Sequence, residues 1–107
     1  MSNKSFLFTY SVSPLNDDYK DVADIIRNRI ARLDGENGWI KLDHVETAFK
    51  GMLDITKVTL ESKREEAEKK VSEILETVFD EKYPSHKVWI SVALLVNELG
   101  GAIEFRF

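Results

Sequence analysis

The sequence predicts one α+β domain whose strands and helices follow one another in the order βαββαβ, with a further strand at the end. Three patterns support this prediction. Near both ends of the chain, apolar and polar residues alternate, which is typical of half-buried strands. Between them, residues 16–34 and 62–79 repeat apolar residues at the spacing of amphipathic helices. The 107 residues contain no linker-like stretch, so we expect a single domain over residues 1–107.

The first strand is expected over residues 4–13, and its large aromatic side chains share one face. Phe6, Phe8 and Tyr10 alternate with residues that are mostly polar. Such a row can stack on the bases of single-stranded RNA, but a core needs its largest residues inside, so we expect them to be buried. Pro14 ends the strand because proline cannot donate to the sheet.

The first helix follows this strand. Either Asn16 or Asp17 can cap its N-terminus, and Gly35 can close it in the left-handed conformation. The apolar stripe that we expect to face the core consists of Tyr19, Val22, Ala23, Ile26, Ile30 and Leu33.

Residues 39–60 allow two interpretations. Residues 45–53 repeat apolar residues at helical spacing, and Asp43 with Glu46 matches a capping box, so a short helix is one option. Lys50-Gly51 resembles a turn, however, and residues 55–60 alternate β-branched residues. We favour two antiparallel strands, with the helix as the alternative.

The second half of the chain predicts a helix and two more strands. The helix is expected over residues 62–79, because Ser62-x-x-Glu65 matches a capping box. Residues 87–96 contain few polar positions, which predicts a strand buried on both faces. A turn leads to the last strand, residues 102–107, which either extends its own sheet or pairs with a second copy.

This order of elements is the ferredoxin-like plan, an antiparallel sheet with two helices on one face. The other face would keep some apolar side chains in contact with water. Such a face usually becomes buried against a partner, so we expect a homodimer. The residues expected at its interface are Leu7, Ile103, Phe105 and Phe107.

Composition narrows the function classes. The chain has no cysteine, which excludes thiolate chemistry, and its net charge of −4 does not favour extensive phosphate contacts. No apolar run approaches a membrane span and no secretion signal is evident, so we expect a cytoplasmic protein without a membrane partner. No cofactor is expected. No metal site is expected either, because Asp43, His44 and Glu46 lie where neighbouring strand residues point to opposite faces.

Over residues 4–60 the chain resembles two groups of small dimeric proteins. The similarity lies in Phe8-Thr-Tyr-Ser-Val-Ser13, in residues 25–30, in Gly38-Trp39 and in residues 45–52. One group is the small ferredoxin-like subunit of the CRISPR adaptation complex, and the other is the GhoS-type endoribonuclease antitoxins. The adaptation subunits carry an acidic residue at the end of the first strand, where this chain has Ser11 or Ser13. Because a neutral hydroxyl is a poor ligand for magnesium, the metal-dependent nuclease chemistry of that family is not expected at this position.

Three functions follow from these observations, and a non-enzymatic role is favoured over an enzyme. The favoured function is binding of an unknown protein or RNA, in a defence, toxin–antitoxin or mobile-element setting. The resemblance implies an endoribonuclease as the alternative, with Asp17, Asp18 and His44 as catalytic residues and Arg27 and Arg29 contacting phosphate. Asp17 and Asp18 are the candidates to replace the missing acidic residue of the adaptation subunits, but a role as first-turn acids of the helix is favoured for both. The further alternative is binding of a small ligand at a dimer interface, which rests on fold analogy alone.

Overall fold

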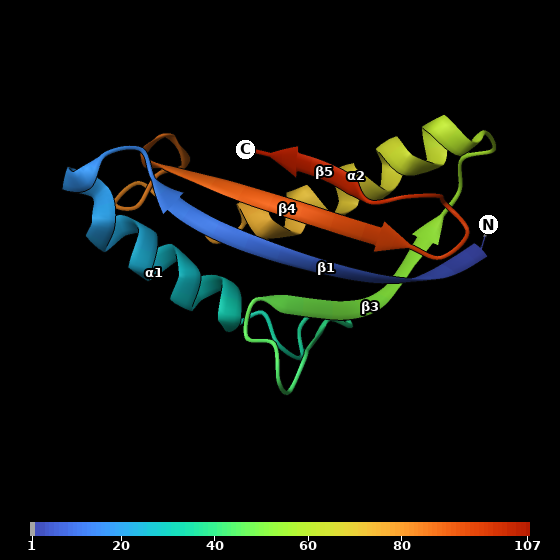
Figure 1. Ribbon diagram of the computed structural model, residues 1–107, viewed down its shortest axis with the longest axis horizontal. Helices are drawn as coiled ribbons and strands as arrows, with labels where there is room; N and C mark the ends of the chain where they lie inside the picture. The colour runs from blue at the N-terminus through green and yellow to red at the C-terminus, as the bar shows by residue number, and fades with distance from the viewer. Residues whose placement is uncertain (1) are drawn as a thin grey trace.

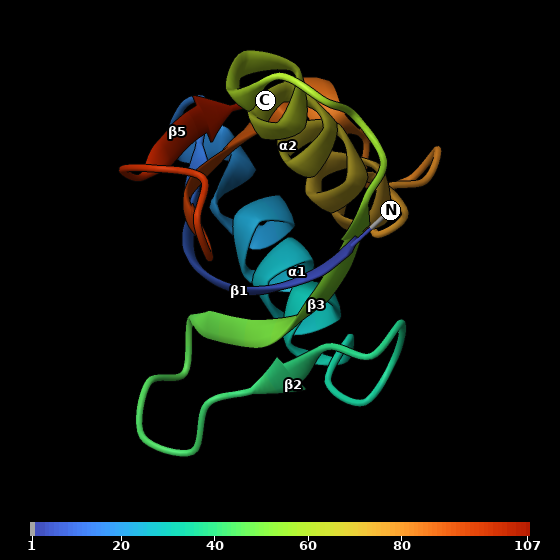
Figure 2. The ribbon, with the colours of Figure 1, turned by 90° about the vertical axis from the view of Figure 1, so that its right-hand side faces the viewer.

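The computed structural model describes residues 2–107 and confirms an α+β fold with a five-stranded antiparallel sheet and two helices on one side (Figures 1 and 2). Two short 3-10 helices, η1 (Asp17–Tyr19) and η2 (Ser85–Lys87), precede α1 and β4. The main elements are, in chain order, β1 (Ser2–Pro14), α1 (Lys20–Ala31), β2 (Ile40–Lys41), β3 (Ala48–Ile55), α2 (Leu60–Glu76), β4 (Val88–Val96) and β5 (Ile103–Arg106).

The strand order across the sheet is β2-β3-β1-β4-β5, and every neighbouring pair is antiparallel. The first four strands have the ferredoxin-like arrangement, and β5 adds to the outer side of β4. In this structure the last strand therefore extends the sheet of its own chain. Figure 2 shows the sheet curving around both helices, which leaves its opposite face uncovered.

An aromatic cluster on β1 forms the centre of the core, as the alternation predicts. Phe6, Phe8 and Tyr10 are all buried. Trp39, in the connection between α1 and β2, packs edge-on against Phe8 with ring centroids 5.0 Å apart. Phe49 on β3 stacks on Phe8 from the neighbouring strand, at 5.5 Å. These contacts join the two central strands to the connection that follows α1.

Residues 48–53 belong to β3 and residues 45–47 to the connection before it, so no part of this segment is helical. Along β3, one face carries buried Phe49, Leu53 and Ile55, and the other face carries exposed residues, which are Lys50, Met52 and Asp54. The expected strand over residues 55–60 is wrong beyond Ile55, because β3 ends there, residues 56–59 form a connection and α2 begins at Leu60. Thr59 caps this helix by accepting the N–H of Ser62 at 3.2 Å, so the cap lies three residues before the predicted capping box.

The expectation that residues 87–96 are buried on both faces is also wrong. Val88, Ile90 and Val92 point toward the helices and are buried. Trp89 and Leu95 point the other way and remain 40% and 47% exposed. The reason is that both helices cover the same face of the sheet, so an apolar outward position stays in contact with water.

Arg64 of α2 fixes the turn between β4 and β5. Its guanidinium donates to the carbonyl oxygens of Leu99, Gly101 and Ala102 at 2.6, 2.7 and 3.3 Å. Gly100 in this turn has a φ of +86°, a conformation that glycine adopts without strain. The start of β5 is therefore held by a single side chain from the neighbouring helix.

Gly51 on β3 lies under the ring of Phe6, its cross-strand partner on β1. A Cβ atom at this position would approach the ring to 2.8 Å and the carbonyl oxygen of Gly38 to 2.9 Å. Only a residue without a side chain leaves room for the ring.

We expect Gly51→Ala to lower the free energy of unfolding by about 1–3 kcal/mol, because the added methyl group overpacks the site beside Phe6. Chemical denaturation measures this effect. Gly101→Ala is the matched control, since a Cβ there meets no atom within 4 Å and no positive φ is involved. Equal stability of the two variants would show that the ring of Phe6 moves aside freely.

Candidate functional site

Asp17 and Asp18 lie in η1, immediately after β1, and both are exposed. The side-chain oxygen of Asn16 accepts the backbone N–H of Asp18 at 2.9 Å, so Asn16 caps this turn. The carboxylate of Asp17 lies 3.8 Å from the ammonium group of Lys20. Both acids occupy the first turn before α1, where carboxylates favour the positive end of the helix dipole.

His44, the third residue of the nuclease alternative, lies on the connection between β2 and β3. Figure 1 shows this connection at the bottom of the molecule, well apart from η1 at the end of β1. Over residues 2–107 no group of three His, Asp or Glu side chains is placed to hold a metal ion. The fold does not bring Asp17, Asp18 and His44 together.

Arg27 and Arg29 both bond within the chain. Arg27 pairs with Asp24 and donates to the carbonyl oxygen of Val12 at 2.6 Å. Arg29 donates to the carbonyl oxygen of Val78 at 2.8 Å and to the carboxylate of Asp80 at 2.9 Å.

These two arginines join α1 to β1 and to the segment after α2. The backbone N–H of Tyr83 and the guanidinium of Arg29 lower the pKa of Asp80, so this carboxylate stays charged beside its partner. The guanidinium of Arg29 also lies 4.9 Å from the ring centroid of Tyr83. A role of these arginines in phosphate binding stays a prediction, and it would require them to leave these partners.

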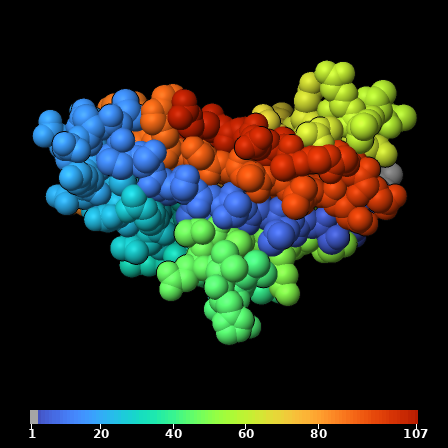
Figure 3. Space-filling model, in the orientation of Figure 1, coloured from blue at the N-terminus to red at the C-terminus, as the bar shows by residue number. Residues whose placement is uncertain are grey.

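The uncovered face of the sheet carries the largest exposed apolar side chains of the strands. They are Leu7 on β1, Ile40 on β2, Met52 on β3, and Trp89 and Leu95 on β4. Figure 3 shows this side of the molecule, with β1, β4 and β5 lying next to one another across it. Ser11 and Ser13 also point to this face and are exposed.

The register of the strands gathers three of these side chains. Leu7 lies directly opposite Leu95, and Met52 lies opposite Ser5, one diagonal step from Leu7. We call Leu7, Met52 and Leu95 the apolar corner. Trp89 lies at the other end of β4, where the guanidinium of Arg106 covers its ring at 4.3 Å.

The other three predicted interface residues lie on the helix side of β5. Ile103 is buried, and Phe105 and Phe107 are half-buried with their rings stacked at 6.1 Å. Leu7 is therefore the one predicted interface residue on the uncovered face. The position of the other three on the helix side was not foreseen, because it depends on the register of β5 with β4.

A hollow of about 540 Å³ lies where the end of α2 meets β4 and the C-terminus. Phe79, Trp89 and Phe107 supply aromatic walls, while Glu76 and His86 supply polar groups. Its size is within the usual range for small-molecule sites. The sequence gives no motif for it, because its lining residues come from separate elements.

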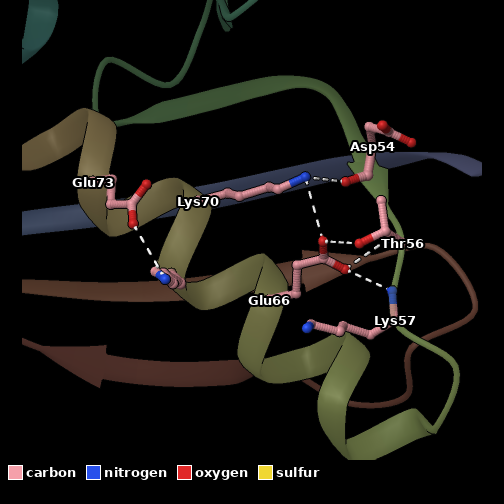
Figure 4. A network of polar contacts seen from close by, with 7 residues as sticks. Asp54, Thr56, Lys57, Glu66, Lys70 and Glu73 are labelled. Carbon is pink, nitrogen blue, oxygen red and sulfur yellow. Dashed lines mark hydrogen bonds and ion pairs between the residues drawn. The ribbon is translucent and has the colours of Figure 1, made fainter. Parts of the chain in front are cut away.

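A second polar site joins α2 to the end of β3 (Figure 4). The Glu66 carboxylate accepts hydrogen bonds from the backbone N–H and the hydroxyl of Thr56, both at 2.8 Å, and from the N–H of Lys57 at 3.1 Å. The ammonium group of Lys70 lies 3.5 Å away and also donates to the carbonyl oxygen of Asp54.

The groups of this network shift the pKa of the Glu66 carboxyl. Partial burial raises the pKa of its carboxyl, but the hydrogen bonds of Thr56 and Lys57 and the charge of Lys70 outweigh burial and lower the pKa to about 2. The groups that contact the Glu66 carboxylate in this network are hydrogen-bond donors from Thr56 and Lys57 and the ammonium group of Lys70. We therefore interpret the network as a structural connection between β3 and α2.

One further ionisable group has a shifted pKa. Burial, and secondarily the charge of Glu46, raises the pKa of the Tyr10 phenol.

Comparisons of the chain with models of protein families, with curated proteins and with solved structures found no match. Neither helix within residues 2–107 has the length and apolar character needed to cross a bilayer.

We expect Glu66→Gln to lower stability at neutral pH by about 1–2 kcal/mol, because the amide keeps only one acceptor oxygen and its hydrogen bonds are no longer charge-assisted. A carboxyl whose pKa is lowered on folding contributes stability above its ordinary pKa of 4.5, and this contribution is lost as the pH falls toward 2. Denaturation of wild type and variant should therefore differ at pH 7 and converge near pH 2.

Glu73→Gln is the control, since Glu73 makes only an exposed pair with Lys69 at 3.9 Å. Its stability should stay within about 0.5 kcal/mol of wild type at both pH values. A Glu66→Gln difference that persists unchanged at low pH would contradict the assigned role of the charge.

Proposed function

We propose that this protein is a homodimeric binding module that recognises another protein through the uncovered face of its sheet. The apolar corner supports the proposal most directly. Leu7, Met52 and Leu95 are 40%, 56% and 47% exposed, although they come from three neighbouring strands and lie side by side. Contiguous exposed apolar groups, bordered by polar ones, are typical of interaction surfaces.

The charges on this face favour a protein over RNA. Lys50 and Arg106 are accompanied by Asp54 and Glu104 on the same side of the sheet, so positive and negative groups balance. Binding of nucleic acid depends mainly on an excess of cations along the phosphate path. Within residues 2–107, the one large aromatic ring on this face is Trp89, and Arg106 is already stacked on it. Arginine and tryptophan side chains of this kind often contribute strongly to protein interfaces.

The proposal includes the setting that the resemblance implies, which is a defence, toxin–antitoxin or mobile-element system in the cytoplasm. An exposed apolar face that is covered in a complex with another protein is compatible with such a role. The separation of Asp17 and Asp18 from His44 supports binding as the main activity.

We expect Leu95→Lys to weaken binding of the natural partner by about tenfold or more, because a charge replaces a buried contact at the centre of the interface. A photo-crosslinking residue at position 95 first captures the partner in the native cells. The captured protein is then purified, and its affinity for wild type and variant is measured by calorimetry.

Val58→Lys is the matched control, because Val58 is 86% exposed but lies in the connection between β3 and α2. It should bind as wild type does. An equal loss of affinity for the partner in both variants would contradict the proposal. An RNA crosslinked at position 95 in place of a protein would contradict it as well.

For the nuclease alternative, we expect wild type and the Asp17→Ala/Asp18→Ala variant to leave RNA equally intact in the presence of magnesium. The structural reason is that these acids lie in the first turn that Asn16 caps, and within residues 2–107 no third metal-ligating side chain lies beside them. Gel analysis of a mixed RNA substrate measures this. Cleavage by wild type that disappears in a folded double variant would establish the endoribonuclease instead.

A further inference from the structure

We propose that two copies of this chain pair through the free edges of β5, in a single antiparallel register centred on Phe105. This inference rests on the proposed homodimer and names the surface that forms it. β5 (Ile103–Arg106) is an edge strand that pairs on one side only, with β4. At the opposite edge of the sheet, β2 has only two residues and offers much less backbone for pairing.

The free backbone groups of this edge belong to Glu104 and Arg106. Phe107 and Ile90 exchange backbone hydrogen bonds in both directions, at 2.8 and 3.0 Å. Bonded and non-bonded pairs alternate along an antiparallel ladder, so the helix-facing residues of β5 are those that bond to β4. The N–H and C=O groups of Glu104 and Arg106 therefore point away from the sheet. Within residues 2–107, no turn or loop backbone bonds to them.

The side chains of the same two residues make the edge self-complementary. Both are exposed, and both lie on the uncovered face. In a two-fold antiparallel pair centred on Phe105, Glu104 of each copy lies opposite Arg106 of the other. The two N–H and two C=O groups of each copy then form four hydrogen bonds between the strands. Opposite charges in directly opposed positions stabilise a strand pair.

In the two neighbouring registers, Glu104 of one copy no longer lies opposite Arg106 of the other. A pair centred on Glu104 sets two carboxylates opposite each other, and a pair centred on Arg106 sets two guanidinium groups opposite each other. Like charges in these positions destabilise the pair. Charged residues often protect an edge strand from association with another strand. Here Glu104 and Arg106 carry opposite charges two residues apart, so they favour association in one register.

Two further features support pairing in this register. Phe105 is half-buried on the helix side, so the two Phe105 rings would meet at the axis and cover each other. Arg64 fixes the turn that leads into β5, so β5 loses little conformational entropy when two copies associate. The interface is short, which predicts a dimer that dissociates on dilution.

Charge reversal tests the register. Sedimentation equilibrium is measured for wild type, Glu104→Arg, Arg106→Glu and the double variant, from micromolar to near-millimolar concentration. Each single variant should dimerise about tenfold more weakly or worse, since both cross-strand pairs become like-charged. The double variant should recover the wild-type affinity, and an equimolar mixture of the two single variants should form the heterodimer. Thermal melting confirms that each variant is folded.

Lys50→Glu is the matched control, because it reverses a charge on the same face of the sheet at β3, away from β5. It should leave dimerisation within about twofold of wild type. A wild type that is monomeric at every concentration would overturn both the proposed dimer and this inference. A wild-type dimer whose affinity is unchanged in the single variants would overturn the β5 pairing alone and leave the proposed dimer to another surface.

Discussion

Burial of the aromatic row on β1 is the constraint on which the rest of this structure depends. Side chains of a strand alternate between two faces, so Phe6, Phe8 and Tyr10 can be buried together only if one face is completely covered. β1 is the central strand of the sheet, and its register with β3 and β4 fixes which residues of those strands face the same side. Both helices therefore pack on that side. The opposite face is left bare as a direct consequence.

The periodicity of the sequence was sufficient to predict the fold class and the order of the elements. The alternation in β1 and the helical stripes of α1 and α2 are strong because each faces a single core. The boundaries were less predictable. Thr59 and Ser62 are both good caps, and the extended backbone at Thr59 gave it the role. The outward residues of β4 are apolar, and a pattern of apolar residues does not reveal whether a second layer covers them.

The surface features depended on register and on long-range contacts, which no local pattern encodes. Leu7 was foreseen on the uncovered face, but its contact with Leu95 follows from the pairing of β1 with β4. Arg27 and Arg29 suggested phosphate binding by their charge alone. Arg27 donates to the carbonyl oxygen of Val12, and Arg29 donates to that of Val78, which lies 49 residues further along the chain.

The apolar corner and the edge of β5 can work together because they use different residues. Pairing at the edge uses Glu104, Phe105 and Arg106, whereas the apolar corner lies across β1, β3 and β4. A two-fold axis perpendicular to the sheet keeps the helices of both copies on one side and the two bare faces on the other. The dimer would then present one continuous ten-stranded surface with two apolar corners related by symmetry. Such a surface favours a partner that is itself two-fold symmetric or has a repeated motif, because two linked contacts bind far more tightly than one.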